Sequence, residues 1–153
     1  MKQIEKIVFQ LENAFNGTPF YGDSIWHIIE SIPFEKANNA INEGHSIAQV
    51  LSHMLVWRDF VSRKIQGDDT YDVVLGGTVD WPEVTIQSES EWIALKQRFS
   101  HSQAEIISLL EGKDDDWLRE KIPGRRYSFN ALIKGIIQHD IYHIGQVNLL
   151  KNG

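Results

Sequence analysis

The stretch Gly135–Leu150, GIIQHDIYHIGQVNLL, decides the fold class of this chain. It contains no proline and many good helix formers, and it therefore predicts a long helix. His139 and His143 lie four positions apart within it, which on a helix places both imidazoles on one face, about 40° apart and one turn from each other. The same face carries the apolar residues Leu132, Ile136, Val147 and Leu150. Because a buried polar group without a partner is costly, the two histidines need partners, and a metal ion bound by both is one solution.

This pair of histidines is weak evidence when it stands alone. In a chain with six histidines the spacing arises easily by chance, and such pairs are more often hydrogen-bonded core or surface residues than ligands. A third histidine, His53, lies on another predicted helix at the border of an apolar stripe. Taken alone, His53 fits a half-exposed ring stacked on Trp57 better than it fits a ligand. His45 and His101 are expected to be exposed to solvent.

Composition excludes several classes of protein. The 153 residues are 42% apolar and 24% charged, which is typical of one soluble domain with its own core. The net charge of −6, with no basic cluster beyond Arg125 and Arg126, argues against a nucleic-acid partner. No apolar run is long enough to span a bilayer, and the first residues do not resemble a signal peptide, so we expect a cytoplasmic protein without a membrane partner. The absence of cysteine excludes thiolate ligands, so any metal would be held by His, Asp or Glu.

Apolar periodicity and helix caps predict an all-α four-helix bundle with long inter-helix connections, formed as a single domain over residues 1–153. Capping patterns at Ser46, Ser88 and Ser128 mark three of the helix starts. Lys113 begins a segment that reads as a solvated turn. The four long helices are expected near residues 2–16, 46–66, 89–111 and 128–151, and short helices near 23–32 and 34–41.

Residues 67–88, GDDTYDVVLGGTVDWPEVTIQS, predict a long connection punctuated by glycine and proline. Long loops in small domains are often functional. The segment is too apolar for a free linker, because it contains Tyr71, Val73, Leu75, Val79 and Trp81. We expect it to pack over one end of the bundle, either as a lid or wall of a ligand site or as a simple hydrophobic cover.

Several motifs together resemble the DinB-like (DinB/YfiT) superfamily over essentially the whole chain. The string GIIQHDIYHIGQV, preceded by Gly124–Ser128, is similar to the last helix of that family. The segment SIAQVLSHMLVWRDF is similar to the helix that carries the family's first histidine, here His53. The Asp80-Trp81-Pro82 loop and the Ser24-Ile25-Trp26 helix also fit.

The resemblance implies a four-helix bundle in which His53, His139 and His143 hold one divalent metal ion. Three imidazoles suit zinc, nickel or similar ions, and three protein ligands leave a coordination position open. The second nitrogen of each histidine should meet an acceptor. The candidate acceptors are Gln49, Asp59, Asp140 and Gln146.

The function implied by the resemblance is that of a metal-dependent enzyme acting on a small electrophile, either a thiol S-transferase or a hydrolase. Because the chain has no cysteine, a thiol would arrive as a low-molecular-weight cosubstrate. The alternative is a non-catalytic metal-binding or stress-response protein, and catalytic residues beyond the metal ligands are not identified. The resemblance also implies a homodimer.

The last helix carries a second apolar face, opposite its histidines. It is formed by Ile133, Ile137, Ile141 and Ile144. A helix that is apolar all round must be buried on more than one side. Either a second copy of the chain or the short helices of residues 23–41 would cover this face.

Overall fold

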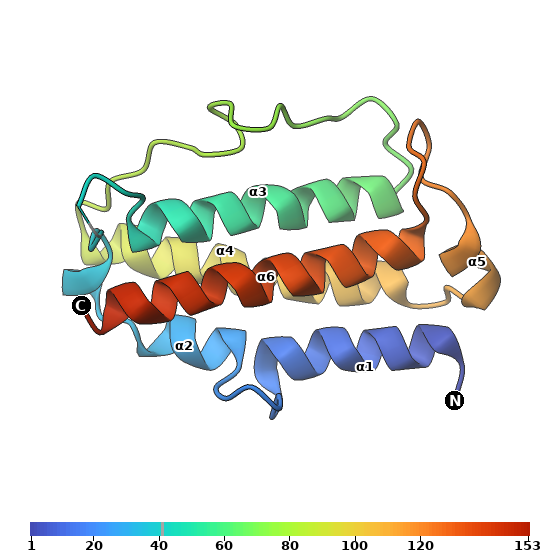
Figure 1. Cartoon of the computed structure of the whole chain (residues 1–153), viewed down its shortest axis with the longest axis horizontal. Coiled ribbons are helices and arrows are strands. Elements are labelled where there is room, and N and C mark those ends of the chain that lie inside the picture. Colours follow the sequence, from blue (N-terminus) through green and yellow to red (C-terminus); the bar gives the residue numbers. More distant parts are fainter. Residues whose placement is uncertain (41) are drawn as a thin grey trace.

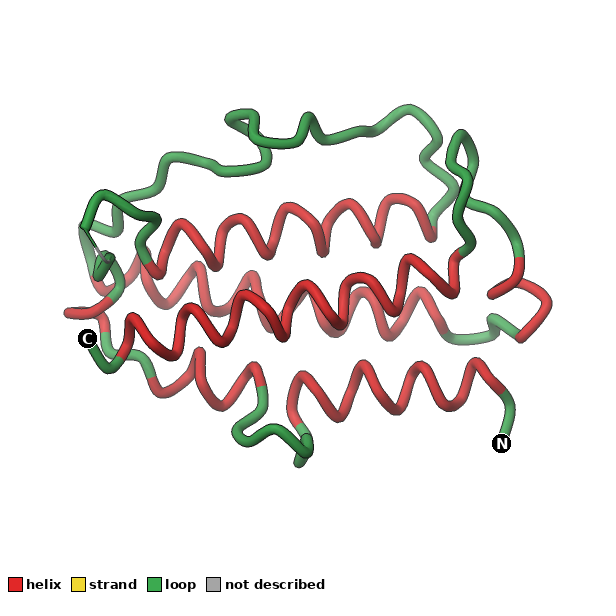
Figure 2. Tube along the Cα trace, in the orientation of Figure 1, coloured by secondary structure: helices red, strands yellow, loops and turns green. Residues whose placement is uncertain are grey.

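The predicted helices form a bundle in the computed structural model, which describes residues 1–40 and 42–153 (Figures 1 and 2). Four helices are long: α1 (Gln3–Asn16), α3 (Ile47–Ile65), α4 (Glu89–Leu110) and α6 (Phe129–Lys151). Three are short: α2 (Ile25–Ser31), the 3₁₀ helix η1 (Phe34–Lys36) and α5 (Asp115–Arg119). No β-strand occurs in the described ranges, so the prediction of an all-α fold is confirmed.

The predicted caps start the long helices. The hydroxyl of Ser46 accepts from the backbone N–H of Gln49, and the Gln49 side chain accepts in return from the Ser46 N–H, which completes the capping box. Ser88 and Ser128 accept from the N–H groups three residues later in the same way. The four long helices therefore begin within about one residue of their predicted starts.

The direction of the helices explains the longest connection. In Figure 1, α3 and α4 run the same way along the bundle, and α1 and α6 run the opposite way. Helix α3 contacts both α4 and α6, and α1 contacts α4 and α6 from the other side. Because α3 and α4 are parallel neighbours, the chain must return along the whole bundle between them. Residues 66–88 make this return along the length of α3 (Figure 1), whereas the sequence predicted a cover over one end.

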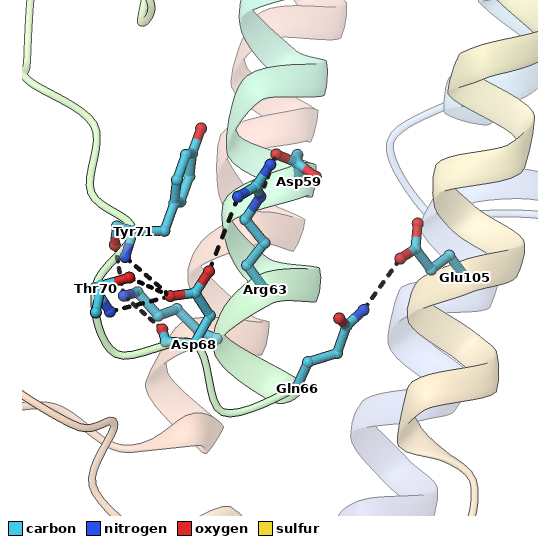
Figure 3. Close-up of polar contacts among 8 residues, drawn as sticks. Asp59, Arg63, Gln66, Asp68, Thr70, Tyr71 and Glu105 are labelled. Carbon is cyan, nitrogen blue, oxygen red and sulfur yellow. Dashed lines mark hydrogen bonds and ion pairs between the residues drawn. The ribbon is translucent and has the colours of Figure 1, made fainter.

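The connection is fixed at both of its ends. Where it leaves α3, a carboxylate oxygen of Asp68 accepts from the N–H groups of Thr70 and Tyr71 (Figure 3). The buried Lys64 ammonium donates to the carbonyls of Asp68 and Tyr71 at 2.9 and 2.6 Å. At the other end, the Asn38 side chain exchanges two hydrogen bonds with the backbone of Ile86. Of the apolar residues of the connection that were predicted to pack on the bundle, Val73 is buried. Leu75 and Val79 are exposed and do not belong to the core.

The core consists of two hydrophobic clusters, one toward each end of the bundle. One cluster joins α2 and the last turn of α1 to the first halves of α3 and α4 and the second half of α6. The other joins the rest of α1, and α5, to the remaining halves of α3, α4 and α6. On α6, the first cluster includes Ile144 and the second ends at Ile136. The residues between the clusters are polar, and they form what we call the polar layer: Arg58, Ser102, Gln103 and Asp140.

Arg58 is the centre of the polar layer. Its guanidinium is fully buried and pairs with Asp140, while it also donates to the side chains of Gln103 and Ser102. The rings of Phe15 and Phe99 lie 5.1 and 5.3 Å from the guanidinium carbon. A buried arginine satisfied in this way holds α3, α4 and α6 together at mid-length.

Two local predictions differ from the structure. Only Phe34–Lys36 of the segment expected as helix 34–41 is helical, and Ile41 lies outside the described residues. The segment expected as a solvated turn instead begins α5, with the Asp114 carboxylate capping the N–H of Trp117. The isoleucine face of α6 is covered by the chain itself, since Ile133 and Ile144 are buried and α1 and α2 contact α6.

Candidate metal centre

Three histidines meet on the face that α3 presents to α6. His53 projects from the middle of α3, and His139 and His143 project from successive turns of α6. The Nε2 atom of His53 lies 3.0 Å from Nε2 of His139 and 3.1 Å from Nε2 of His143. The three rings offer donor atoms that all lie within 4.8 Å of one another. The structure therefore brings all three predicted site residues together.

Hydrogen bonds fix the tautomers of two of these rings. Nδ1 of His53 lies 2.8 Å from the backbone oxygen of Asp80 and 3.0 Å from its Oδ1. Nδ1 of His143 lies 2.7 Å from Oε1 of Gln146. Because these partners are acceptors, each neutral ring carries its proton on Nδ1 and directs the lone pair of Nε2 at the other ring.

Two lone pairs 3.1 Å apart repel unless a cation or a proton lies between them. Protonation of His139 and His143 is disfavoured, because burial and the neighbouring histidines lower the pKa of His139 to about 4 and also lower the pKa of His143. The rings of His139 and His143 are therefore neutral near pH 7, the form that binds metals. These two rings thus suit a bound cation better than they suit a bound proton.

The geometry fits a divalent ion after a small adjustment. A tetrahedral ion with bonds of about 2.0–2.1 Å separates its ligand nitrogens by about 3.3–3.4 Å. The Nε2 atoms at 3.0 and 3.1 Å need to move apart by only a few tenths of an ångström. Three histidines could thus hold a metal ion here with an open position.

Asp80 organises the surroundings of the cluster. It is buried, and besides contacting His53 it accepts from the indole Nε1 of Trp57 at 2.7 Å and from the N–H of Gly76 at 2.8 Å. The connection between α3 and α4 therefore supplies the carboxylate that orients a candidate ligand, as metal-binding histidines require. Asp80 was not among the predicted acceptors, although it lies in the Asp80-Trp81-Pro82 motif.

Of the four predicted acceptors, only Gln146 contacts a histidine of the cluster. Gln49 caps α3, Asp59 pairs with Arg63 on the surface, and Asp140 pairs with Arg58. Nδ1 of His139 is buried with no partner among the described residues.

Aromatic stacking completes the wall around His53, but the ring that stacks on it is Trp81 and not the predicted Trp57. Trp81 stacks on His53 with 3.7 Å between ring centroids, and His45 stacks on the other face of Trp81 at 3.9 Å. Trp57 instead meets His139 edge-on at 6.2 Å. His53 is 4% exposed rather than half-exposed, while His45 and His101 are exposed as predicted. Residues 66–88 thus form a wall of the site.

Two pockets flank the histidine cluster. One of about 380 Å³ reaches His143, with Trp81, His45 and Tyr142 in its walls. The other, of about 240 Å³, reaches His139 and is lined by Trp57 and Phe60. A third pocket of about 410 Å³, between α3, α4 and the connection, does not include the histidines of the cluster. A ligand can therefore approach the cluster from two sides.

No helix in the described part of the chain combines the length and the apolar character needed to cross a membrane. None of the curated proteins compared with the chain matches it. The model of the DinB superfamily matches residues 22–147, a range that contains all three histidines, Asp80 and both flanking pockets except for Leu149 and Leu150. This match spans most of the sequence, and the chain therefore belongs to the DinB superfamily.

Proposed function

We propose that His53, His139 and His143 bind one divalent ion, such as Zn²⁺ or Ni²⁺, and that the protein is a metal-dependent enzyme acting on a small electrophile. The observation that carries this proposal is the approach of three Nε2 atoms, since that of His53 lies 3.0 Å from that of His139 and 3.1 Å from that of His143. The oxygen atoms that face Nδ1 of His53 and of His143 favour a proton on Nδ1 in both rings, which leaves Nε2 free to bind an ion.

A bound divalent ion would make a coordinated water or thiol acidic enough to ionise near neutral pH. The residues of the chain orient the ligands and shape access. Asp80 holds His53 and Trp57, and Gln146 holds His143. Trp81 covers one face of His53 and excludes water from it. These roles suit attack by a thiolate or a hydroxide on a bound electrophile.

The nucleophile defines two versions of the reaction. In thiol S-transfer, the sulfur of a low-molecular-weight thiol attacks an electrophilic carbon, whose leaving group departs with the bonding electron pair. In hydrolysis, water takes the place of the thiol. The chain has no cysteine, so the thiol would be a cosubstrate. The pocket beside His143, with its aromatic walls and the amide of Gln146, has room for one.

The second candidate is a non-catalytic metal-binding protein. One observation favours it: Asp80, the carboxylate that contacts the cluster, already accepts from Trp57 and Gly76 and touches His53. It has little capacity left to act as a general base. A reaction at this site would depend on the ion to lower the pKa of its nucleophile.

The test is metal analysis of protein purified without a histidine tag, followed by assays with a thiol and a panel of small electrophiles and esters. We expect one ion per chain and turnover that a chelator abolishes. Bound metal without turnover of any substrate would favour the non-catalytic candidate. Absence of metal after incubation with Zn²⁺ and Ni²⁺ would refute both candidates.

A homodimer is part of the proposal. The isoleucine face of α6 no longer supports it, because α1 and α2 cover that face. Tyr142 and Leu149 support it instead, since these large side chains on α6 are 68% and 70% exposed. Both lie at the mouth of the pocket beside His143, so a second copy placed there would border the site.

A further inference from the structure

The pocket beside His139 differs in chemistry from the pocket beside His143. It lies between the second half of α3 and the first half of α6, two neighbouring helices in Figure 1. Its walls are the rings of Trp57 and Phe60 and the side chains of Val61, Leu132 and Ile136. Apart from His139 at one end and Tyr127 at the other, it is lined only by apolar residues and a glycine.

The geometry points to this pocket as the subsite for a neutral apolar group, an aryl or short branched alkyl group, carried by the substrate. This inference rests on the proposed function, because it places the reactive atom of that substrate at the histidine cluster. A charged group would lose its hydration here without meeting a counter-ion among the lining side chains. The guanidinium of Arg125 lies 5.7 Å from the centroid of the Phe60 ring, but it is paired with Asp72. An apolar group, in contrast, is stabilised when it leaves water for this pocket.

The wall of the pocket is held rigid by the same carboxylate that orients the cluster. The indole N–H of Trp57 donates to Oδ1 of Asp80, and that oxygen also lies 3.0 Å from Nδ1 of His53. The Trp57 ring packs edge-on against Phe60, with centroids 5.2 Å apart. The aromatic wall is therefore prepared before a ligand arrives, which lowers the entropic cost of binding.

Gly135 keeps the pocket open. It lines the pocket from α6, and a Cβ added at this position would meet no heavy atom within 4 Å. A side chain there would occupy the pocket instead of colliding with the core. Gly145 is a matched control, because it lies on the same helix, is exposed, has the same free space and lines neither pocket beside the cluster.

The experiment is a titration of the full chain with benzyl alcohol, benzoate and benzylammonium, followed by NMR. The reporters are the indole N–H of Trp57 and the backbone N–H of Gly135. In metal-free protein we expect benzyl alcohol to shift both signals and the two charged analogues to bind at least about tenfold more weakly than benzyl alcohol. Gly135→Leu should weaken the binding of benzyl alcohol by about tenfold or more, whereas Gly145→Leu should leave it unchanged.

The titration is run with and without Zn²⁺, so that the subsite and the metal site are tested separately. Binding of benzyl alcohol at Trp57 in protein that takes up no metal would support the subsite while the proposed function fails. If the protein takes up metal but benzyl alcohol shifts only NMR signals around Tyr142, the subsite is overturned and the proposed function stands. The same conclusion follows if Gly135→Leu binds benzyl alcohol as tightly as the wild type does. Equal binding of all three probes to metal-free protein would also overturn the subsite.

Discussion

His53 and Asp80 are joined by two contacts, one from the imidazole Nδ1 to the backbone oxygen at 2.8 Å and one to the carboxylate Oδ1 at 3.0 Å. The first contact survives any substitution at position 80, whereas the second needs the carboxylate. A substitution of Asp80 therefore removes the carboxylate from His53 while it leaves the backbone contact in place.

Replacing Asp80 should therefore weaken metal binding without removing it. In Asp80→Ala the backbone contact to His53 remains, but the indole N–H of Trp57 and the N–H of Gly76 lose their acceptor. We expect the affinity for Zn²⁺ to fall by about 10–100-fold, measured by competition with a chromogenic chelator. Asp59→Ala, at an exposed carboxylate on α3, is the control and should bind as the wild type does. Equal affinities in both variants would mean that the carboxylate does not act on the site.

Removing a histidine of the cluster should abolish stable binding. His139→Ala and His143→Ala each leave two ligands, which are too few to hold the ion through dialysis. The measurement is the metal content of untagged protein after loading and desalting. His101→Ala, at an exposed histidine on α4 outside the cluster, should keep the wild-type content. Retention of one ion per chain in His139→Ala would contradict the ligand assignment.

The polar layer predicts that replacing two different arginines of α3 lowers the free energy of unfolding by very different amounts. Arg58→Met leaves the carboxylate of Asp140 buried without its partner, and we expect the free energy of unfolding to fall by about 3–5 kcal/mol. Arg63→Met removes solvent-accessible pairs with Asp59 and Asp68 and should cost less than about 1 kcal/mol. Urea denaturation of both variants gives the comparison. Similar decreases in the free energy of unfolding would mean that the buried ion pair contributes no more to stability than the solvent-accessible pairs do.

Asp115 should make the stability of α1 depend on pH. Its carboxylate accepts from the N–H groups of Gln3 and Ile4 at the start of α1, and these hydrogen bonds hold its pKa below the usual value. A carboxyl with a lowered pKa in the folded state stabilises the protein above its unfolded pKa, and this stabilisation is lost as the pH falls through the folded value.

The stability difference between wild type and Asp115→Ala should accordingly be present at pH 7 and should shrink below about pH 4. Thermal unfolding across this range measures it. Asp116→Ala is the control, because that residue lies in the same turn of α5 but pairs with the exposed Arg119 instead of capping α1. A difference that stays constant down to pH 2 would exclude the ionised cap as its source.

The proposed dimer has a direct test. Light scattering at micromolar concentration should give twice the mass of one chain. Leu149→Glu, at an exposed position on α6, should shift the mass toward that of a single chain, and Phe9→Glu, at an exposed position on α1, should not. A wild-type protein with the mass of one chain would count against the dimer.

The four long helices could be predicted from the sequence because each carries an apolar period, and three of them also begin at a predicted cap. The apolar stripe of α6 predicted an inward face for His139 and His143. His53 lay at the border of the stripe of α3 and was assigned to the site only through the family resemblance. Asp80 had no such signal. It lies 27 positions from His53 in a connection without periodicity, and its place depends on the parallel course of α3 and α4.

Other features were hidden for related physical reasons. Helix α5 has only five residues, which is too short to display a helical period. The stacking of Trp81 on His53 depends on where the connection passes, so the nearer aromatic in sequence, Trp57, looked like the better partner. Burial of Arg58 depends on acceptors from α4 and α6, which cannot be read from its own helix.

The polar layer also determines how far along α3 the last helix can sit. A slide of α6 by one turn, about 5.4 Å, would draw Asp140 away from Arg58 and place a carboxylate among apolar side chains of one of the two clusters. Apolar contacts alone tolerate such a slide far better, because one aliphatic side chain can replace another. Asp140 follows His139 directly in sequence, so the ion pair that selects the helix register also selects which turns of α6 face His53.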